Sequence, residues 1–411
     1  MTETCDILIS GGGIAGLTAA AAFGTAGFKV ICVDPTPPVT DGAAEGADLR
    51  STAMLQPARG LMERAGLWDA LAPLAAPLQV MRIKEFDASE ISDQPFGWNF
   101  PNWLLRRELM AHLSELDTVD FRAGVGTSRL FTRTGSAKVT LSDGSRVKTR
   151  LVIAADGRGS PMRAASGIGV HTQRYGQKAL VFAVTHPVPH ENVSTEVHRT
   201  GGPFTLVPLP DHEGMPCSAV VWMDDGPLAQ ERLEMPVVEF EAAASTRSCH
   251  HFGPLTLVSR RQVWPIITQH AERLSAERVA LVAEAAHVMP PIGAQGLNMS
   301  LNDIATLLDL AQARPEGLGD AEMLESYHKA RYGDITLRGR GAERTLQCPA
   351  CAPVADADGS GDALGVLGRF RFQLGGMRLD LLDDVIHHLV IAELVALLAR
   401  QIDHAGARTA A

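Results

Sequence analysis

The sequence feature that most constrains the fold is a glycine-rich turn near the N-terminus. Residues 11–16 read GGGIAG, between an apolar segment at 5–10 (CDILIS) and an alanine-rich segment at 17–26. The first segment is typical of a buried strand and the second of a helix, and 28–34 (FKVICVD) predicts a second strand that ends in an acid. A strand–helix–strand unit requires a parallel sheet covered by helices, so the predicted fold class is α/β.

The glycine spacing predicts a phosphate-binding turn. Gly11, Gly13 and Gly16 fit the pattern G-x-G-x-x-G, whose glycines form a tight turn, admit a pyrophosphate to the backbone and let the helix pack on the strand. Asp34, at the end of the second strand, stands where a carboxylate accepts hydrogen bonds from ribose hydroxyls. An adenine dinucleotide is expected here. The acid disfavours the 2′-phosphate of NADP, but the turn alone does not separate FAD from NAD.

Two further segments end apolar strands in a similar way. Asp156-Gly157 follows the strand that starts at Arg150, although an Asp-Gly pair alone is also a common surface turn. The stretch AEAAHVMPPIGAQGLN (283–298) follows an apolar run at 279–282 and leads into a helix predicted over 297–310. Such strand ends converge at the carboxyl edge of one parallel sheet, where α/β proteins bind their ligands.

The middle of the chain has a different pattern. Between about 178 and 265, longer strands alternate with proline, glycine and polar turns, which predicts an antiparallel sheet. A helix interrupted at Pro57 is expected over 54–71. The predicted organisation is a discontinuous Rossmann-like domain (1–77, 103–177 and 275–340), a substrate-binding β-sheet domain (78–102 and 178–274) and a C-terminal helical region (341–411).

Composition excludes several classes of protein. The 411 residues carry a formal net charge of −10, which disfavours a nucleic-acid partner. The six cysteines are scattered and the N-terminus has no signal-peptide pattern, so a cytoplasmic location is expected. The most apolar segment, 381–400, is interrupted by acids and histidines. It predicts an amphipathic helix packed on the protein rather than a membrane span.

No metal site is expected. Cys348 and Cys351 form one C-x-x-C without a second pair, so a tetrahedral zinc site lacks ligands. The fourteen histidines show no spacing suited to a metal. His287 is expected to be a packed or backbone-bonded residue rather than a catalytic base.

Taken together, the three strand-end segments resemble the flavoprotein aromatic hydroxylases, single-component FAD monooxygenases related to para-hydroxybenzoate hydroxylase. Within that family, 175–209, VWPI at 263–266 and 279–307 are similar to the ubiquinone-biosynthesis hydroxylases, and Tyr327, Arg331 and Asp334 fit the helix spacing of that group. The similarity extends from the N-terminus to about residue 340. The resemblance implies a Rossmann-like FAD-binding domain beside the antiparallel substrate sheet.

The resemblance also implies roles for individual residues. The ADP half of FAD would be held by Gly11, Gly13, Ile14, Ala15, Gly16 and Asp34, with Val125 lining the adenine pocket. Arg50 and Arg106 match arginines near the pyrophosphate and ribityl chain, although either is also explained as a solvated helix charge. Asp156 and Gly157 match a motif associated with FAD and with the reduced pyridine nucleotide. The loop under the isoalloxazine ring matches Pro291, Gly293, Gly296, Leu297 and Asn298, with no acid or base assigned to it.

One pair of residues departs from the family pattern. Ala283 and Glu284 stand where most relatives have Gly-Asp. The longer carboxylate of Glu284 can still reach a ribityl hydroxyl if the backbone lies slightly further from the cofactor. The pair is interpreted as a tolerated variant, and it is also where an inactive homologue would first differ.

The implied activity is hydroxylation of an aromatic ring. NADPH or NADH reduces FAD, O₂ adds at flavin C4a, and an electron-rich ring attacks the distal oxygen of the hydroperoxide. The implied substrate is a lipid-like polyprenylated phenol of ubiquinone biosynthesis. Two alternatives stay open: a hydroxylase of small phenols or polyketide aromatics, and a non-catalytic flavin-binding subunit of a quinone-biosynthesis complex. The resemblance also allows peripheral contact with the inner membrane, membership of such a complex, and a homo-oligomer.

Overall fold

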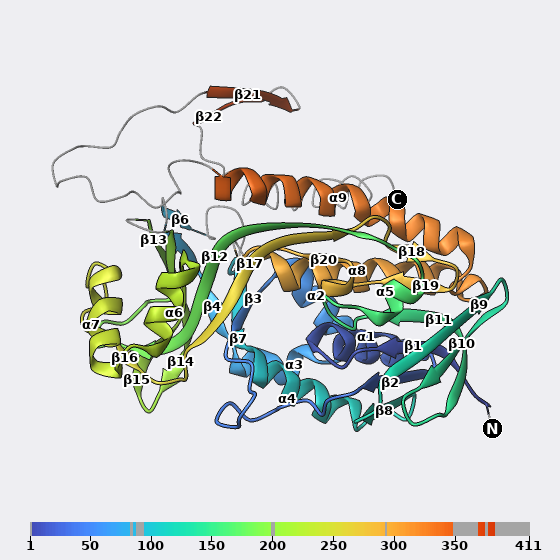
Figure 1. Cartoon of the computed structure of the whole chain (residues 1–411). Helices are drawn as coiled ribbons and strands as arrows, with labels where there is room; N and C mark the ends of the chain where they lie inside the picture. Colours follow the sequence, from blue (N-terminus) through green and yellow to red (C-terminus); the bar gives the residue numbers. More distant parts are fainter. Residues whose placement is uncertain are drawn as a thin grey trace.

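The structure of the chain is a computed structural model that describes residues 2–82, 85–87, 94–198, 202–291, 294–347, 369–374 and 377–382. These residues form two large sheets, a small three-stranded sheet and a set of helices (Figure 1). Parallel strands covered by helices form one of the large sheets, so the α/β prediction is confirmed.

The first large sheet is built around the strand that precedes the glycine turn. Its strands follow the order β18–β19–β11–β1–β2–β8, with β10 paired to β11 and β9 paired to β10. Ile7 of β1 lies opposite Val30 and Leu151 in parallel register and is completely buried. Burial on both faces explains the unbroken apolar runs seen in these strands. The strands are β1 (Thr2–Ser10), β2 (Val30–Asp34), β8 (Val119–Ala123), β9 (Thr127–Arg133), β10 (Ser136–Leu141), β11 (Arg146–Ala154), β18 (Ser275–Ala276) and β19 (Val279–Leu281).

Helices cover this sheet. α1 (Ile14–Thr25) begins directly after the glycine turn and is buried along almost its whole length. It packs against α4 (Asn102–Leu113) and α8 (Gln295–Ala313), and α8 packs against the long α9 (Ala321–Gln347), which lies on the outside of the molecule in Figure 1. The short helical segments nearby are α5 (Pro161–Ala165), η3 (Ala283–Ala285) and η4 (Pro315–Gly317).

The second large sheet is almost entirely antiparallel, as predicted for 178–265. The exception is the parallel pairing of β5 with β13. Its longest strand, β12, pairs with β15 on one side and β17 on the other, and Figure 1 shows β12 and β17 as curved strands that extend across the molecule. α6 (Gly226–Glu234) and α7 (Val237–Arg247) accompany it. The strands are β5 (Val80–Arg82), β6 (Glu85–Asp87), β12 (Val170–Thr185), β13 (Val193–His198), β14 (Pro203–His212), β15 (Met215–Asp225), β16 (Thr256–Leu257), β17 (Gln262–Ala271) and β20 (His287–Val288).

The helix predicted over 54–71 is confirmed in part, since 56–64 and 68–71 are helical but 54–55 are not. The chain forms β3 (Ser51–Leu55), α2 (Gln56–Arg64), α3 (Trp68–Leu71) and the single turn η1 (Ala72–Leu74). β3 pairs with β7 (Gly97–Pro101), which also pairs with β4 (Ala76–Leu78) to complete the small sheet. Pro57 lies in the first turn of α2, where its missing N–H costs no helical hydrogen bond, so the proline starts the helix rather than interrupting it.

The C-terminal region differs in part from the predicted helical region at 341–411. α9 continues to Gln347 as a helix, but β21 (Arg369–Leu374) and β22 (Met377–Leu382) form an antiparallel strand pair. Cys348, Cys351 and most of the helix predicted at 381–400 lie outside the described residues. Among the helices that are described, none combines the length and the apolar character needed to cross a membrane.

The two large sheets draw on different parts of the chain. The first takes its strands from 2–34, 119–154 and 275–281, and the second takes most of its strands from 80–87 and 170–271. β20, which follows the 283–286 turn, pairs with β17 and so joins the second sheet. The domain boundaries stay a prediction: the one at 177/178 falls inside β12, and β20 falls in the part assigned to the Rossmann-like domain.

Candidate cofactor and substrate site

A cavity of about 500 Å³ reaches from the glycine turn to the second large sheet. Its walls come from the start of α1, from β3 and α4, from the turn after β11, from the 283–300 segment and from β13, β14 and β15. Segments far apart in the sequence therefore share one space. The predicted site residues that line it are Gly13, Ile14, Ala15, Arg50, Arg106, Gly157, Glu284, Pro291, Gly296 and Leu297.

The three glycines of the turn differ in how closely the chain packs around them. A Cβ on Gly11 would lie 2.3 Å from the carbonyl oxygen of Ala155, and one on Gly16 would lie 1.9 Å from the carbonyl oxygen of Gly11. Gly11 also has φ = 107°, a conformation that L side chains rarely adopt. Around Gly13 nothing lies within 4 Å of a built Cβ, so this face of the turn is open to the cavity. α1 begins there without a side-chain cap, which leaves its first N–H groups available to an anion.

Asp34 is fixed beside the turn by backbone hydrogen bonds. Its Oδ2 accepts the Gly12 N–H at 2.5 Å and its Oδ1 accepts the Thr36 N–H at 2.7 Å. Val125 donates its N–H to the carbonyl oxygen of Asp34 at 3.0 Å. The carboxylate predicted to meet the ribose and the residue predicted to line the adenine pocket are thus neighbours, although neither lines the cavity itself.

A buried acid that was not predicted organises the two arginines. Asp48, with 6% exposure, accepts hydrogen bonds from Arg50 Nε at 2.9 Å and Arg50 Nη2 at 2.8 Å, and from Asn102 Nδ2 at 3.0 Å. Arg106 Nη2 lies 3.7 Å from the same carboxylate. Burial alone would raise the pKa of Asp48, but Arg50, Asn102 and Arg106 outweigh it and lower that pKa. In the sequence, the D-x-R spacing at 48–50 could have indicated that Asp48 pairs with Arg50.

The Asp-Gly turn after β11 holds an unsatisfied buried atom. Asp156 Oδ2 accepts the Met162 N–H at 3.0 Å, whereas Asp156 Oδ1 is buried and has no hydrogen-bond partner among the described residues. Burial raises the pKa of this carboxyl group, although Ser160, Met162 and Ser10 oppose the change. Gly157 has φ = 79° and lines the cavity. Asp156 itself does not line the cavity, whereas its neighbours Ala155 and Gly157 do.

The 283–298 segment forms the opposite wall. The Glu284 side chain is exposed and lines the cavity, and the strand-end turn is the 3-10 helix η3. α8 begins at Gln295 after Ala294, which has φ = 55° and provides no side-chain cap, so the first N–H groups of α8 are available at the cavity wall. Pro291 lines the same wall, and Gly293 lies outside the described residues.

Asn298 lies away from the cavity and links two elements. Its Oδ1 accepts the Leu55 N–H at 2.9 Å, and its Nδ2 donates to the carbonyl oxygens of Ala53 and Ala294, each at 2.7 Å. The side chain is 4% exposed. Asn298 therefore joins α8 to β3, and through them it positions the loop that was predicted to face the flavin.

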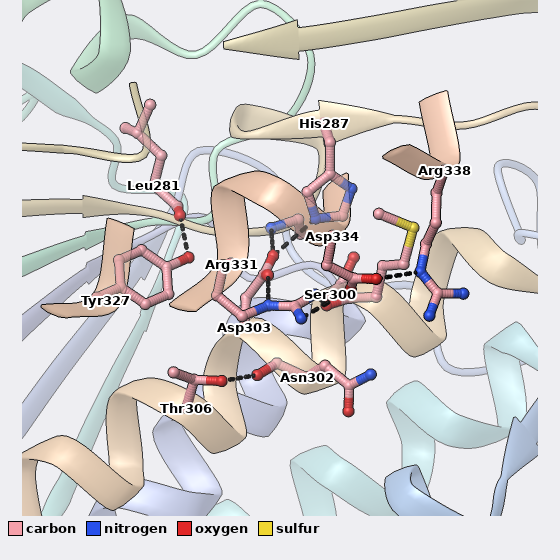
Figure 2. Close-up of polar contacts among 12 residues, drawn as sticks. Leu281, His287, Ser300, Asn302, Asp303, Thr306, Tyr327, Arg331, Asp334 and Arg338 are labelled. Carbon is pink, nitrogen blue, oxygen red and sulfur yellow. Dashed lines mark hydrogen bonds and ion pairs between the residues drawn. The ribbon is translucent and has the colours of Figure 1, made fainter. Parts of the chain in front are cut away.

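A buried charge network supports the same wall from behind (Figure 2). Asp303 of α8, with no exposed surface, accepts hydrogen bonds from Arg331 Nε at 2.8 Å and pairs with His287 Nε2 at 2.7 Å. Burial alone would raise the pKa of Asp303, but His287 and Arg331 lower it. Arg331 also bonds to Asp334, which bonds to Arg338. His287 is thus a packed residue, as expected, and its partner is a carboxylate.

Metal binding has no support in the described part of the chain. No group of three or more histidine, cysteine, aspartate or glutamate side chains there could hold an ion.

The features of the site together fit a flavin dinucleotide. They are the glycine turn, the uncapped starts of α1 and α8, and the two arginines. The fold and site define the class as a dinucleotide-binding flavoprotein.

Comparisons with known proteins agree with this class. Residues 4–334 match the family described as FAD binding domain. The chain is 33% identical over 345 residues to ubiquinone hydroxylase UbiL of Rhodospirillum rubrum, covering 82% of this chain and 79% of that protein. It is 25% identical over 352 residues to 3-demethoxyubiquinol 3-hydroxylase of Escherichia coli, covering 83% and 89%. The solved structure of PqsL from Pseudomonas aeruginosa covers 84% of this chain and 96% of its own at TM-score 0.71 and 21% identity, which shows the shared fold.

The chain therefore belongs to the FAD-binding-domain family of flavoprotein aromatic hydroxylases, in the group of the ubiquinone hydroxylases. It is an FAD-dependent monooxygenase, for which NAD(P)H and O₂ are the expected co-substrates. The predicted family, fold class, activity and cofactor are confirmed.

Proposed function

We propose that the chain hydroxylates the aromatic ring of a polyprenylated phenol in ubiquinone biosynthesis. Two relatives named above are a ubiquinone hydroxylase and a 3-demethoxyubiquinol 3-hydroxylase. The observation that carries the proposal is the continuous cavity between the glycine turn and the second sheet, which gives a ring-shaped substrate a place beside the cofactor. Its volume lies within the range of about 300–1,000 Å³ that is typical of small-molecule sites.

In this proposal the residues described above hold FAD. The first N–H groups of α1, around Gly13, bind the pyrophosphate, and Arg50 and Arg106 supply positive charge near it. Asp156 and Glu284 would accept hydrogen bonds from ribityl hydroxyls; Glu284 lines the cavity, and Asp156 lies between two residues that do. The backbone N–H groups at the start of α8 would stabilise negative charge on the reduced ring. When bound, FAD would supply the redox chemistry, because the flavin can be reduced by NAD(P)H and can then activate O₂.

The protein contributes exclusion of water and orientation. Leu78, Val207 and Val221 give the cavity apolar surface on the side of the second sheet, and Pro290 and Pro291 stiffen the opposite loop. A dry site strengthens electrostatic interactions and limits loss of the activated oxygen to water. The two alternative functions are not favoured, since the named relatives are catalytic and act in the ubiquinone pathway.

A polyprenyl chain partitions into lipid, so the proposed substrate is expected at a membrane. We place the enzyme in the cytoplasm at the inner-membrane surface, as a peripheral protein that can join a quinone-biosynthesis complex or a homo-oligomer. None of the described helices has the length and apolar character of a membrane span.

The test is flavin content and substrate-stimulated oxidation of the reductant. The purified protein should show the absorption spectrum of bound FAD. A 2-prenylphenol should accelerate oxidation of NADPH or NADH severalfold, more than phenol itself does. Bound FAD without acceleration by any phenol, with either nucleotide or with an added ferredoxin-type donor, would contradict the proposal. Acceleration by short phenols alone would favour the small-phenol alternative.

A further inference from the structure

The side chain of Gln295 lies between the cavity and a buried arginine. Gln295 is the first residue of α8, lines the cavity and is 6% exposed. Its Oε1 accepts a hydrogen bond from Arg338 Nη1 at 3.3 Å. Because a guanidinium group only donates, this bond fixes which end of the amide faces Arg338. The amide nitrogen, Nε2, therefore points away from the arginine.

That nitrogen is a donor without an acceptor. Gln295 Nε2 bonds to no residue of the described chain, and it keeps accessible surface, unlike the fully buried unpaired nitrogens of Arg106 and His287. Since Gln295 lines the cavity and the rest of its side chain is enclosed, this surface faces the cavity. A donor held at this place fits an acceptor on a bound molecule.

Arg338 is itself held by the buried charge network described above. It is 7% exposed and donates its Nε to Asp334 Oδ1 at 2.7 Å. Asp334 Oδ2 accepts a hydrogen bond from Arg331 Nη1 at 2.9 Å, and Arg331 Nε donates to Asp303 of α8 (Figure 2). The bonds thus run from α8 to α9 and return to α8 at Gln295. The orientation of the Gln295 amide is set by the protein, before any molecule binds.

The amide lies beside the backbone N–H groups at the start of α8. Ala294 provides no side-chain cap there, and Ala294, Gln295 and Gly296 all line the cavity. A helix N-terminus favours negative charge, as does a side-chain N–H donor. The amide and the helix start therefore act on the same part of a bound molecule.

We propose that Gln295 donates a hydrogen bond to the isoalloxazine ring of FAD and binds the reduced ring more tightly than the oxidised one, with Arg338 as its positioning residue. This inference rests on the placement of the ring at the start of α8 in the proposed function. Hydride transfer from NAD(P)H adds two electrons and one proton to the neutral ring and leaves one negative charge on it. A hydrogen bond to a charged acceptor is about twice as strong as one to a neutral acceptor. Gln295 therefore raises the reduction potential of the bound flavin.

The test is the midpoint potential of FAD bound to Gln295→Met. Methionine keeps the length of the side chain but donates no hydrogen bond. The full chain, saturated with FAD and without a phenol, is titrated with a reductant beside a reference dye. The potential should fall by about 30 mV, which for a two-electron couple is a tenfold loss of preference for the reduced ring. Gln295→Glu, which adds a negative charge at the same place, should lower the potential further.

Variants of Arg338 test the positioning role. Arg338→Met leaves the Gln295 amide free to turn, so the potential should fall in the same direction as in Gln295→Met. Arg338→Lys can still donate to Gln295 Oε1 and should restore most of the wild-type potential.

Gln312→Met is the matched control on the same helix. Gln312 also accepts a hydrogen bond from an arginine, Arg64 Nη2, at 3.0 Å, but it is exposed and does not line the cavity. Its replacement should leave the potential of the bound flavin unchanged.

An unchanged potential in Gln295→Met would overturn the inference, and so would an equal fall in Gln312→Met. Failure of Gln295→Met to bind oxidised FAD would also count against it, because the oxidised ring is expected to lose little affinity. A wild-type potential in Arg338→Met would remove the positioning role. If wild type hydroxylates no phenol, the proposed function fails, but the potentials still test this inference because no substrate is present.

Discussion

Ala283 has a left-handed backbone at the turn that follows β19, with φ = 55°. For an L-residue with a Cβ this conformation costs about 1–2 kcal/mol, whereas glycine adopts it freely. The resemblance to the hydroxylases places glycine at this position, so the backbone geometry explains the family preference. The turn keeps its shape in this chain because Ala283 is buried and its N–H points to the buried Asp303 Oδ2 at 3.3 Å.

Replacement of Ala283 by glycine should therefore stabilise the protein. Relief of the strain exceeds the added entropy of the unfolded chain, and we expect the free energy of unfolding to rise by about 0.5 kcal/mol. Chemical denaturation of the FAD-free protein measures the change. Ala286→Gly is the matched control, because Ala286 has φ = −93° and glycine there should be destabilising. A loss of stability in Ala283→Gly would contradict the strain argument.

At single residues, sequence reasoning located the glycines whose backbone is tightly packed or open to the cavity. Gly11, Gly13 and Gly16 have steric reasons that local spacing encodes. Asp48 was missed, because a buried acid is recognised by its partners, and two of them, Asn102 and Arg106, come from α4, far along the chain. The hydrogen bonds of the Asn298 amide could not be predicted either, because they join it to a strand far away in the sequence.

At the scale of elements, Asp303 connects the site to the long helices. One carboxylate on α8 bonds to Arg331 of α9 and to His287 of β20 (Figure 2). Arg331 is 4% exposed and His287 is 2% exposed. A buried charge set of this kind fixes relative position, because removing one member leaves the others uncompensated.

Asp303→Asn should lower the free energy of unfolding by about 3 kcal/mol at pH 7, since Arg331 loses its fully buried partner. The lowered pKa of Asp303 means that the unfolded chain binds the proton first, so the stabilisation is complete above about pH 5 and is lost as the pH falls below 3.8, the ordinary value for the group. Denaturant unfolding of wild type and variant at several pH values measures both effects.

Asp309→Asn is the control on the same helix. Asp309 pairs with Arg64 at the surface, with 63% of its side chain exposed, and should change the stability by less than about 1 kcal/mol. Equal losses in the two variants, or a difference between wild type and Asp303→Asn that grows on acidification, would show that the buried network does not have the stabilising role described.

The elements that sequence reasoning predicted well are those whose pattern is local. β1, α1 and β2 follow directly from apolar runs around a glycine turn. The helical pattern over 54–71 was right for α2 and α3 but misleading at its start, because pairing of Met54 and Leu55 with β7 outweighs helix propensity there. The β21–β22 pair within the predicted helical region was missed as well, and strand pairing is again a non-local interaction.

For the whole molecule, the functional claim depends on the convergence of distant segments. The glycine turn, the arginine pair, the 283–300 segment and the second sheet share one cavity. Sequence reasoning predicted that three strand ends would meet at a sheet edge, and the structure brings Gly13, Gly157 and Glu284 to the same space. It did not predict the wall of β13, β14 and β15, because the face a strand presents depends on register across the sheet.

The source of the oxygen in the product tests the central claim most directly. FAD-loaded protein is supplied with NADPH or NADH, 2-prenylphenol and ¹⁸O₂, and the product is analysed by mass spectrometry. A ring-hydroxylating monooxygenase predicts one new hydroxyl group on the aromatic ring, with its oxygen derived from ¹⁸O₂. Oxidation of the nucleotide that yields only hydrogen peroxide, or a product whose new oxygen comes from water, would contradict the account.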